Sequence, residues 1–332
     1  MEIALETPSG ARATIHRLGA TLTSLFIPTV GDVVLAGSDG SLAQYSGLIG
    51  RVCNRTRPFD LNGKTWTPSA LLHGGLAGWD TKVWSLSPRQ QPPGTVQLYL
   101  DDDGGEQEGF PGRVSVYASF ILSEDSNGVL SLEIKVVVRN LSIVQAIVNP
   151  TNHTFWNLSA FELDLSSHKL HIPGQRSRLL VDKDQVCTGE EIATARDPVF
   201  SFANQRALDN IDAFVDDIDF GGLDHFFLVD GKGGSNALAM LACLSVGKEH
   251  GKRLEMQIWS DRPGMQVYTG NFLDSTVPMK QRNGFFYPRR CAIAIEASMP
   301  PNAVNIPRFR DSVILDPGKE ASAQFVYKFF VS

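Results

Sequence analysis

The stretch RVSVYASFIL at residues 113–122 alternates apolar and polar side chains with a period of two. Such alternation is typical of a β-strand that buries one face. The stretch LSLEIKVVV at residues 130–138 repeats the pattern. Between them, residues 123–128 end in an Asn-Gly pair, which favours a reversal of the chain. We therefore predict an antiparallel hairpin over residues 113–138.

The same alternation recurs through the rest of the chain. It is found in LEMQI at residues 254–258 and in FVYKFFV at residues 325–331. The segment Phe202–Leu208 predicts one short helix. The 30 glycines and 18 prolines punctuate the strands along the whole chain, so no linker marks a domain boundary. The predicted fold class is all-β: a large antiparallel β-sandwich with few short helices, forming a single domain over residues 1–332.

The composition is that of an ordinary globular protein. Of the 332 residues, 42% are hydrophobic and 20% are charged, and the formal net charge is −6. An acidic chain without a dense run of lysine and arginine repels phosphate backbones, so we expect no nucleic-acid partner. The longest apolar run, Ala237–Leu244, is far shorter than the roughly 20 residues of a membrane helix, so we expect no membrane span.

The four cysteines are widely separated, at Cys53, Cys187, Cys243 and Cys291. None has the CxxC spacing of a structural zinc site or a dithiol redox motif. The first twenty residues lack the basic segment and apolar stretch of a secretory signal. We expect free thiols and a cytoplasmic location.

His73 lies in a setting that fits a ligand site. It belongs to LLHGG at residues 71–75 and is followed by Trp79 and Trp84. Glycines let a backbone approach a ligand closely, and tryptophan faces suit the C–H faces of a sugar ring. A glycine turn above core tryptophans fits the same residues.

His153 lies in a denser polar setting, NPTNHTFWNL at residues 149–158. Amides and hydroxyls crowd there beside aromatic rings, which is typical of a polyol-binding site. A polar loop at the end of a strand is the alternative. Asp224, next to His225, is likewise open to three interpretations: a buried carboxylate, an acceptor for a sugar hydroxyl, or a turn residue.

Glu296 interrupts the apolar strand AIAIEA at residues 292–297. A buried glutamate is rare unless it is paired or functional. Desolvation would raise its pKa towards neutrality, as a general base requires. A salt-bridged core glutamate is the alternative.

Metal and cofactor motifs are not found in the sequence. His168 and His171 form an H-x-x-H, but residues three apart in a strand face opposite sides and cannot share one metal ion. There is no phosphate loop, dinucleotide fingerprint or nucleophile elbow. We expect no metal and no cofactor.

Several blocks of sequence stand together in a characteristic order: GRVCNR at residues 50–55, LNGK at 61–64, LHGG at 72–75 with GWD at 78–80, EGFPG at 108–112, TNHTFWNL at 151–158, LDHFF at 223–227, PGMQVYTGNF at 263–272, IEA at 295–297 and PNAVN at 301–305. In these blocks the sequence resembles the aldose 1-epimerase (galactose mutarotase) family over nearly its whole length.

The resemblance implies an enzyme that interconverts the α and β anomers of a free hexose such as galactose or glucose by acid and base catalysis. It implies a β-sandwich that binds the sugar on an open concave face, no cofactor, a monosaccharide as ligand, and a monomer or weak homodimer. Carried over position by position, the general base is Glu296 and the general acid is His153. His73 would bind and polarise the region of the ring oxygen. The residues implied to hold sugar hydroxyls are Asn54, Arg55, Asp224 and Gln266.

Four positions depart from the family pattern. Cys53 stands where alanine is usual, Leu223 where an aromatic residue is common, Phe226 where asparagine is common, and Ser298 where glutamine is usual. They leave the implied acid and base in place and bear on which sugar is preferred.

Two other functions fit the same fold. A hexose-6-phosphate mutarotase would need an arginine cluster for the phosphate, and the candidates are Arg289, Arg290, Arg308 and Arg310. A non-catalytic sugar-binding or regulatory protein would be marked by loss of the acid or the base. Here His153 and Glu296 are both present.

Overall fold

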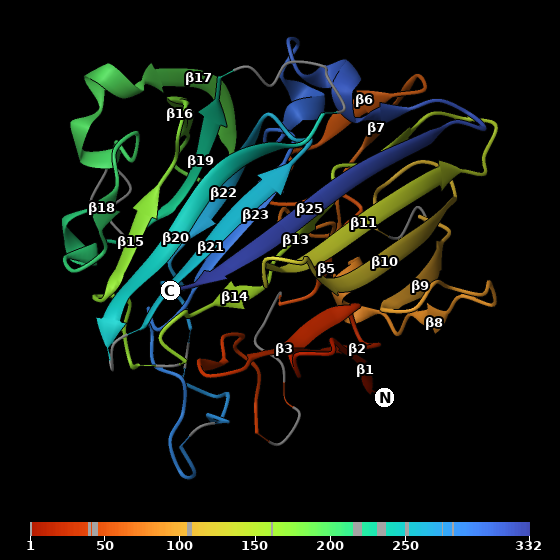
Figure 1. The fold of residues 1–332 in the computed structure, drawn as a ribbon. Helices are drawn as coiled ribbons and strands as arrows, with labels where there is room; N and C mark the ends of the chain where they lie inside the picture. The colour runs from red at the N-terminus through yellow and green to blue at the C-terminus, as the bar shows by residue number, and fades with distance from the viewer. Residues whose placement is uncertain are drawn as a thin grey trace.

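The computed structural model describes residues 2–38, 41, 46–104, 108–160, 162–214, 221–230, 237–249, 252–273, 275–280 and 282–332. Two large antiparallel sheets dominate this part of the chain. In Figure 1 the strands of the larger sheet run diagonally across the molecule, with β19, β22 and β23 of the smaller one behind them. The all-β prediction is confirmed.

The larger sheet has nine strands in the order β18-β15-β20-β21-β25-β11-β10-β9-β8. Their bounds are Arg206–Ala207, His168–His171, Ala239–Glu249, Lys252–Ser260, Glu320–Val331, Leu130–Asn140, Val114–Glu124, Thr95–Asp102 and Ser85–Leu86. The predicted hairpin is its β10–β11 pair, in which Val114 is opposite Asn140 and Glu124 is opposite Leu130. Gly128 in the connecting turn has a φ of 78°, a conformation that glycine adopts without strain.

The smaller sheet has six strands in the order β14-β23-β22-β19-β16-β17. Their bounds are Phe155–Trp156, Ile293–Ser298, Gly264–Tyr268, Asp224–Val229, Gln175–Val181 and Cys187–Ala193.

The remaining strands form small sheets around these two. One has four strands, β1 to β4, at Glu2–Glu6, Arg12–His16, Thr21–Ile27 and Gly31–Asp32. Three have two strands: β5 (Leu48–Ile49) with β13 (Thr151–Asn152), β6 (Phe59–Leu61) with β7 (Lys64–Trp66), and β12 (Ala146–Ile147) with β24 (Ile314–Leu315).

The helices of the described residues are single 3-10 turns: η1 Trp79–Thr81, η2 Thr194–Arg196, η3 Pro198–Phe200, η4 Ile211–Ala213, η5 Ala303–Asn305 and η6 Arg310–Val313. None of these described helices is long and apolar enough to cross a membrane. The helix predicted at Phe202–Leu208 is wrong, because Arg206–Ala207 form strand β18 against β15. Backbone pairing with a sheet edge outweighs the weak helical preference of so short a segment.

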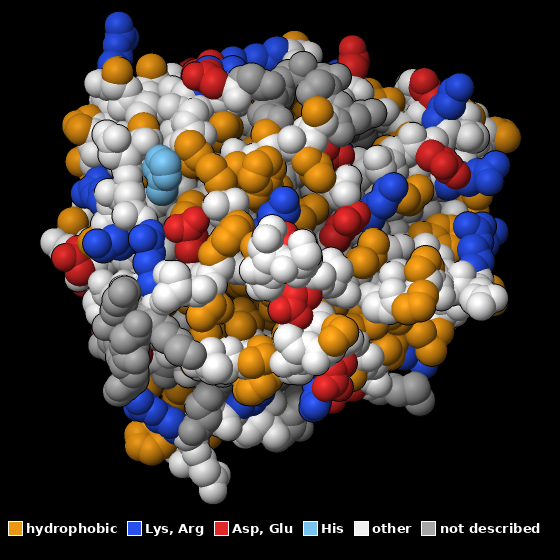
Figure 2. Space-filling model, viewed as in Figure 1, with side chains coloured by type: hydrophobic (Ala, Val, Ile, Leu, Met, Phe, Trp, Pro, Cys, Tyr) orange, Lys and Arg blue, Asp and Glu red, His pale blue; other side chains and the backbone are white. Residues whose placement is uncertain are grey.

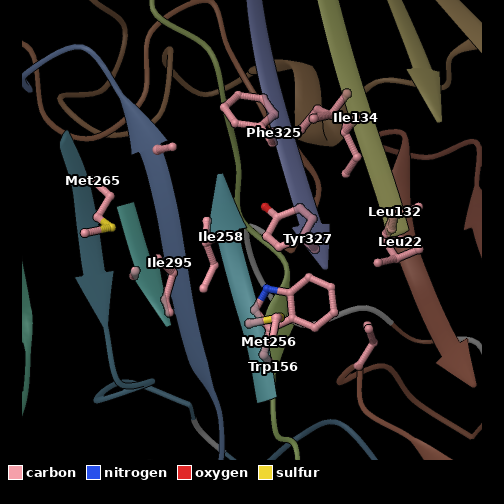
Figure 3. Packing of buried hydrophobic residues seen from close by; sticks show 14 of the residues in the cluster. Leu22, Leu132, Ile134, Trp156, Met256, Ile258, Met265, Ile295, Phe325 and Tyr327 are labelled. Atoms are coloured by element: carbon pink, nitrogen blue, oxygen red, sulfur yellow. The ribbon is translucent and has the colours of Figure 1, made fainter. Parts of the chain in front are cut away.

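The main core lies between the two large sheets. Figure 3 shows Met265 of β22 and Ile295 of β23 facing Ile258 of β21, with Phe325 and Tyr327 of β25 alongside. Side chains on a strand alternate between faces, so the neighbours of these core residues point to the other side of the smaller sheet. That second face carries the polar residues described below. The outer surface in Figure 2 shows charges of both signs interspersed, in keeping with the modest net charge.

A buried ion pair fixes the segment that leads into the predicted sugar-binding residues. Arg51 donates through Nε to Asp102 Oδ2 at 3.2 Å, and the two side chains are only 1% and 7% exposed. Arg51 also donates to the carbonyls of Pro111 and Gly112 at 2.6 and 2.8 Å. Trp79 Nε1 donates to the same carboxylate oxygen at 2.7 Å. The loop before Asn54 is thereby tied to three other segments.

The charge on Asp102 is strongly favoured in the folded state. Burial would raise the pKa of this carboxyl, but the charges of Arg51 and Lys82 and the Trp79 hydrogen bond lower it to about 2, from an ordinary 3.8. Because the folded pKa is below the ordinary one, the ionised form stabilises the fold at neutral pH. That contribution is lost as the pH falls from 3.8 towards about 2.

We expect Arg51→Met to lower the free energy of unfolding by about 3–5 kcal/mol, since it leaves a buried carboxylate without its main partner. Urea denaturation at pH 7 measures the change. The matched control is Arg113→Met, which removes an exposed pair with Asp101 and should cost less than about 1 kcal/mol. Equal losses in the two variants would contradict the structural role assigned to Arg51.

Candidate active site

A pocket opens on the second face of the six-stranded sheet. Its open volume is about 600 Å³. The lining side chains come from strands β14, β19, β22 and β23 and from four loops: the loop before β6, the loop after β7, the link between β13 and β14, and the loop after β22. They are Asn54, Arg55, Leu72, His73, His153, Phe155, Asp224, Tyr268, Phe272, Leu273 and Glu296.

Glu296 and His153 meet at the bottom of this pocket. The distance from His153 Nε2 to Glu296 Oε1 is 3.3 Å, and the two side chains are 4% and 3% exposed. Ile293, Ile295 and Ala297 of the same strand enter the main core, so the alternation of β23 turns Glu296 to the pocket. The pair is thus withdrawn from water yet open to a ligand.

Burial shifts the pKa values of the pair in opposite directions. It raises the pKa of Glu296 well above its usual range, and the negative charge of Asp224 adds to that effect. It lowers the pKa of His153 to about 4. Both shifts favour the uncharged forms of the two groups, a protonated carboxyl beside a neutral imidazole.

His73 and Asn54 hold one another in place beside His153. The backbone amide of Asn54 donates to His73 Nδ1 at 3.1 Å, and the backbone amide of His73 donates to the backbone carbonyl of Asn54 at 3.0 Å. Both residues have left-handed backbones, with φ of 58° and 53°. The His73 ring meets that of His153 edge to face, with centroids 5.3 Å apart. Burial, with the charges of His153 and Arg55, lowers the pKa of His73 well below its usual range. A neutral Nδ1 is the form that accepts the Asn54 amide.

Arg55 and Asp224 supply charged groups at the pocket wall. Arg55 is half-buried, and within the described ranges its guanidinium makes no hydrogen bond or ion pair. Asp224 Oδ1 accepts from Gln266 Nε2 at 2.7 Å. The arrangement offers donors and acceptors to a ligand with several hydroxyl groups.

The predicted site residues are therefore largely brought together. Six of them line this pocket: Asn54, Arg55, His73, His153, Asp224 and Glu296. Gln266 is opposite Glu296 in the β22–β23 register, but its side chain lines an adjoining pocket and reaches this one through Asp224.

Three aromatic residues that line the pocket, Phe155, Tyr268 and Phe272, were missed by the sequence analysis. Phe155 and Tyr268 flank the His153 ring, with centroids 5.0 and 6.1 Å from it. Phe155 is two positions from His153, and Tyr268 is two positions from Gln266. Because residues two apart in a strand share a face, this spacing could have identified both. The tryptophans considered for this role, Trp79 and Trp84, are instead packed in the main core.

The polar residues around His153 do not themselves form a polyol site. Thr151 Oγ1 donates to the Ala297 carbonyl at 2.9 Å, and Asn152 Nδ2 donates to Tyr327 Oη at 2.9 Å. Asn157 Nδ2 donates to the Cys291 carbonyl at 2.7 Å. These groups secure the loop within the protein and leave His153 and Phe155 to line the pocket.

None of the four departures from the family pattern lines the pocket that holds Glu296. Leu223 is buried in the main core. Cys53 lies beside Ser298, and burial raises the pKa of its thiol to about 12. Neither of these two lines the pocket. Phe226 differs, because it lines the adjoining pocket.

The protonation of His153 is open to a direct test. We expect its imidazole to titrate near pH 4 in the empty protein, as measured by NMR of ring nitrogens. In Glu296→Gln the midpoint should stay in the same range, because the carboxyl it replaces is already uncharged. A wild-type midpoint above 6.5 that drops in the variant would show instead an ionised Glu296.

Comparison with known proteins gives one consistent family. The family model described as aldose 1-epimerase matches residues 1–328. The chain is 30% identical to the galactose mutarotase of Homo sapiens, over 97% of this chain and 92% of the relative. It is 27% identical to the aldose 1-epimerase of Escherichia coli, over 98% of this chain and 94% of the relative.

Solved structures show the same fold. The GalM/aldose epimerase homologue of C. elegans superimposes with a TM-score of 0.79 at 24% identity, covering 99% of this chain and 98% of that one. A galactose 1-epimerase of Lactobacillus acidophilus gives a TM-score of 0.74 at 23% identity, covering 100% and 94%.

Proposed function

Because the chain belongs to the aldose 1-epimerase family and is an isomerase, we propose that it interconverts the α and β anomers of a free hexose. The observation that carries the proposal is the buried contact of His153 with Glu296 at 3.3 Å, at the bottom of a pocket lined by hydrogen-bonding groups. The substrate is a monosaccharide such as galactose or glucose, and the catalytic unit is residues 1–332 as a single domain.

The reaction needs one base and one acid. Glu296 takes the proton of the C1 hydroxyl, and His153 gives a proton to the ring oxygen. The bond from C1 to the ring oxygen breaks, and the open aldehyde turns about C1–C2. On reclosure the roles reverse, so both residues return to their starting state. Each group contributes about 10²–10⁴-fold to the rate.

The uncharged pair of the empty pocket can reach the reactive form without a proton from water. A protonated carboxyl beside a neutral imidazole holds the same number of protons as a carboxylate beside an imidazolium. Transfer of one proton across the 3.3 Å contact converts the first into the second. Such a pair titrates as a unit.

The remaining lining residues hold the sugar. Arg55 and Asp224 bind hydroxyl groups, with Gln266 fixing the carboxylate from behind. The neutral His73 contacts the region of the ring oxygen, and Asn54 contributes its side chain to the same wall. Phe155 and Tyr268 present apolar faces to the sugar.

The pocket favours a free sugar over a sugar phosphate. Among the described lining residues Arg55 is the only arginine. Arg308 pairs with Glu191, and Arg290 pairs with Asp212 and donates to the Gly221 carbonyl. Neither lines the pocket that holds Glu296.

We further propose that the protein works in the cytoplasm as a monomer or weak homodimer. All four cysteines are buried and free, which suits a reducing compartment.

Polarimetry tests the activity and the catalytic pair together. Wild type should accelerate the change in rotation of freshly dissolved α-D-galactose or α-D-glucose. Glu296→Gln and His153→Asn should each lose about 10²–10⁴-fold in kcat. The control Glu133→Gln, on the opposite sheet, should keep the wild-type rate. Sugar binding without acceleration by the wild type would support a binding protein instead.

We expect a bell-shaped dependence of kcat/KM on pH. Below about pH 4 the pair gains a second proton, which leaves no base. Above the raised pKa of Glu296 the pair loses its transferable proton, which leaves no acid. Measurements from pH 3 to pH 10 by anomer exchange check both limbs. A single limb with a midpoint near the ordinary glutamate value of 4.5 would contradict the buried-pair mechanism.

A further inference from the structure

A second pocket adjoins the one that holds Glu296. Its open volume, about 560 Å³, is close to that of the first. Asn54, Arg55 and Asp224 line both, so the two spaces meet at these three residues.

The register of the sheet sets the direction of the second pocket. Glu296 of β23 is opposite Gln266 of β22, and Gln266 is opposite Phe226 of β19. In the next pair of strands Phe227 of β19 is opposite Arg178 of β16. Because these strands are antiparallel, Leu179 is then next to Phe226, and it continues the row formed by Glu296, Gln266 and Phe226 across the sheet. Because adjacent strands are 4.7–4.9 Å apart, Phe226 lies roughly 10 Å from Glu296 along one face. A sugar with C1 at Glu296 and a hydroxyl at Asp224 points its far side along this row.

The floor of the second pocket is apolar. Leu179, Cys187 and Phe226 are at most 3% exposed and belong to one hydrophobic cluster. Val181, Phe214 and Pro301 complete the apolar lining. Besides the three residues shared by both pockets, the lining also carries polar side chains, and two of them have partners within the protein: Gln266 donates to Asp224, and Asn271 donates to the Leu223 carbonyl. The others are Gln185 and His225, and the His225 ring is tilted against Phe200 with centroids 4.5 Å apart. An apolar group there would leave few polar atoms without partners.

Resting on the proposed function, we propose that the enzyme accepts aldoses that carry an apolar substituent, an alkyl, acyl or aryl group, on a hydroxyl remote from C1. The sugar ring occupies the pocket of Glu296, and the substituent occupies the pocket floored by Phe226. The departure of Phe226 from the usual asparagine gives this floor its apolar surface. Anomerisation is unchanged, because the substituent lies away from O1 and the ring oxygen.

The test compares the mono-O-benzyl ethers of D-galactose and D-glucose, at O3, O4 and O6, with the parent sugars. Anomer exchange is measured by NMR. We expect one regioisomer to have a KM about tenfold below that of its parent with a similar kcat, since burial of a benzyl group removes apolar surface from water. No regioisomer with a lower KM than its parent would overturn the inference.

Two variants locate the effect. Val181→Asp places a charge in the second pocket at a half-buried position and should abolish the tenfold gain while leaving the parent sugars unchanged. The matched control Leu180→Asp, at the next half-buried residue, which does not line either pocket, should keep the gain. Equal effects of Val181→Asp on ether and parent would contradict the assignment.

Reducing disaccharides such as cellobiose serve as the polar comparison. A gain for cellobiose with none for the benzyl ethers would show a hydrophilic pocket and overturn the apolar class. If neither parent sugar nor ether is anomerised, the proposed function itself fails. If the parents are anomerised and no ether gains, only this inference fails.

Discussion

Side chains on a β-strand alternate between two faces, and in β23 one face packs in the core while the other carries Glu296 into the pocket. Ile293, Ile295 and Ala297 pack between the sheets, which fixes the strand in position. Glu296 must then point to the other face, where water is excluded by His153 and its aromatic neighbours. The core packing that stabilises the fold therefore also fixes the position of the Glu296 carboxyl.

In the proposed mechanism, burial also prepares the His153–Glu296 pair for proton transfer. In water at neutral pH a carboxyl would be ionised and an imidazole only partly protonated, and both would be surrounded by competing hydrogen bonds. In the pocket, burial raises the pKa of the Glu296 carboxyl and lowers that of the His153 imidazole, and one contact of 3.3 Å joins the two groups. The charged groups of the site, Arg55 and Asp224, line the same pocket.

Much of this arrangement could be predicted from the sequence, and the failures have physical causes. The strands were found because alternation is a local pattern, and the family blocks gave six of the eleven lining residues. The helix at Phe202–Leu208 was wrong because pairing of β18 with β15 is a contact between distant segments. Trp79 and Trp84 were open to two interpretations because sequence does not say which face of a loop meets the core. The second pocket joins β16, β17 and β19 with Pro301, and no local pattern reports such a meeting.

The left-handed backbones of Asn54 and His73 limit how this family member can diversify. The Asn54 backbone amide donates to the His73 ring, and the His73 backbone amide donates to the Asn54 carbonyl. Few residues other than glycine, asparagine, aspartate and histidine tolerate the left-handed conformation that both adopt. Mutational drift or directed evolution at either position therefore meets a backbone barrier before any question of sugar recognition arises. Phe226 lies in strand β19 with an ordinary extended backbone, so substitutions there meet no such barrier.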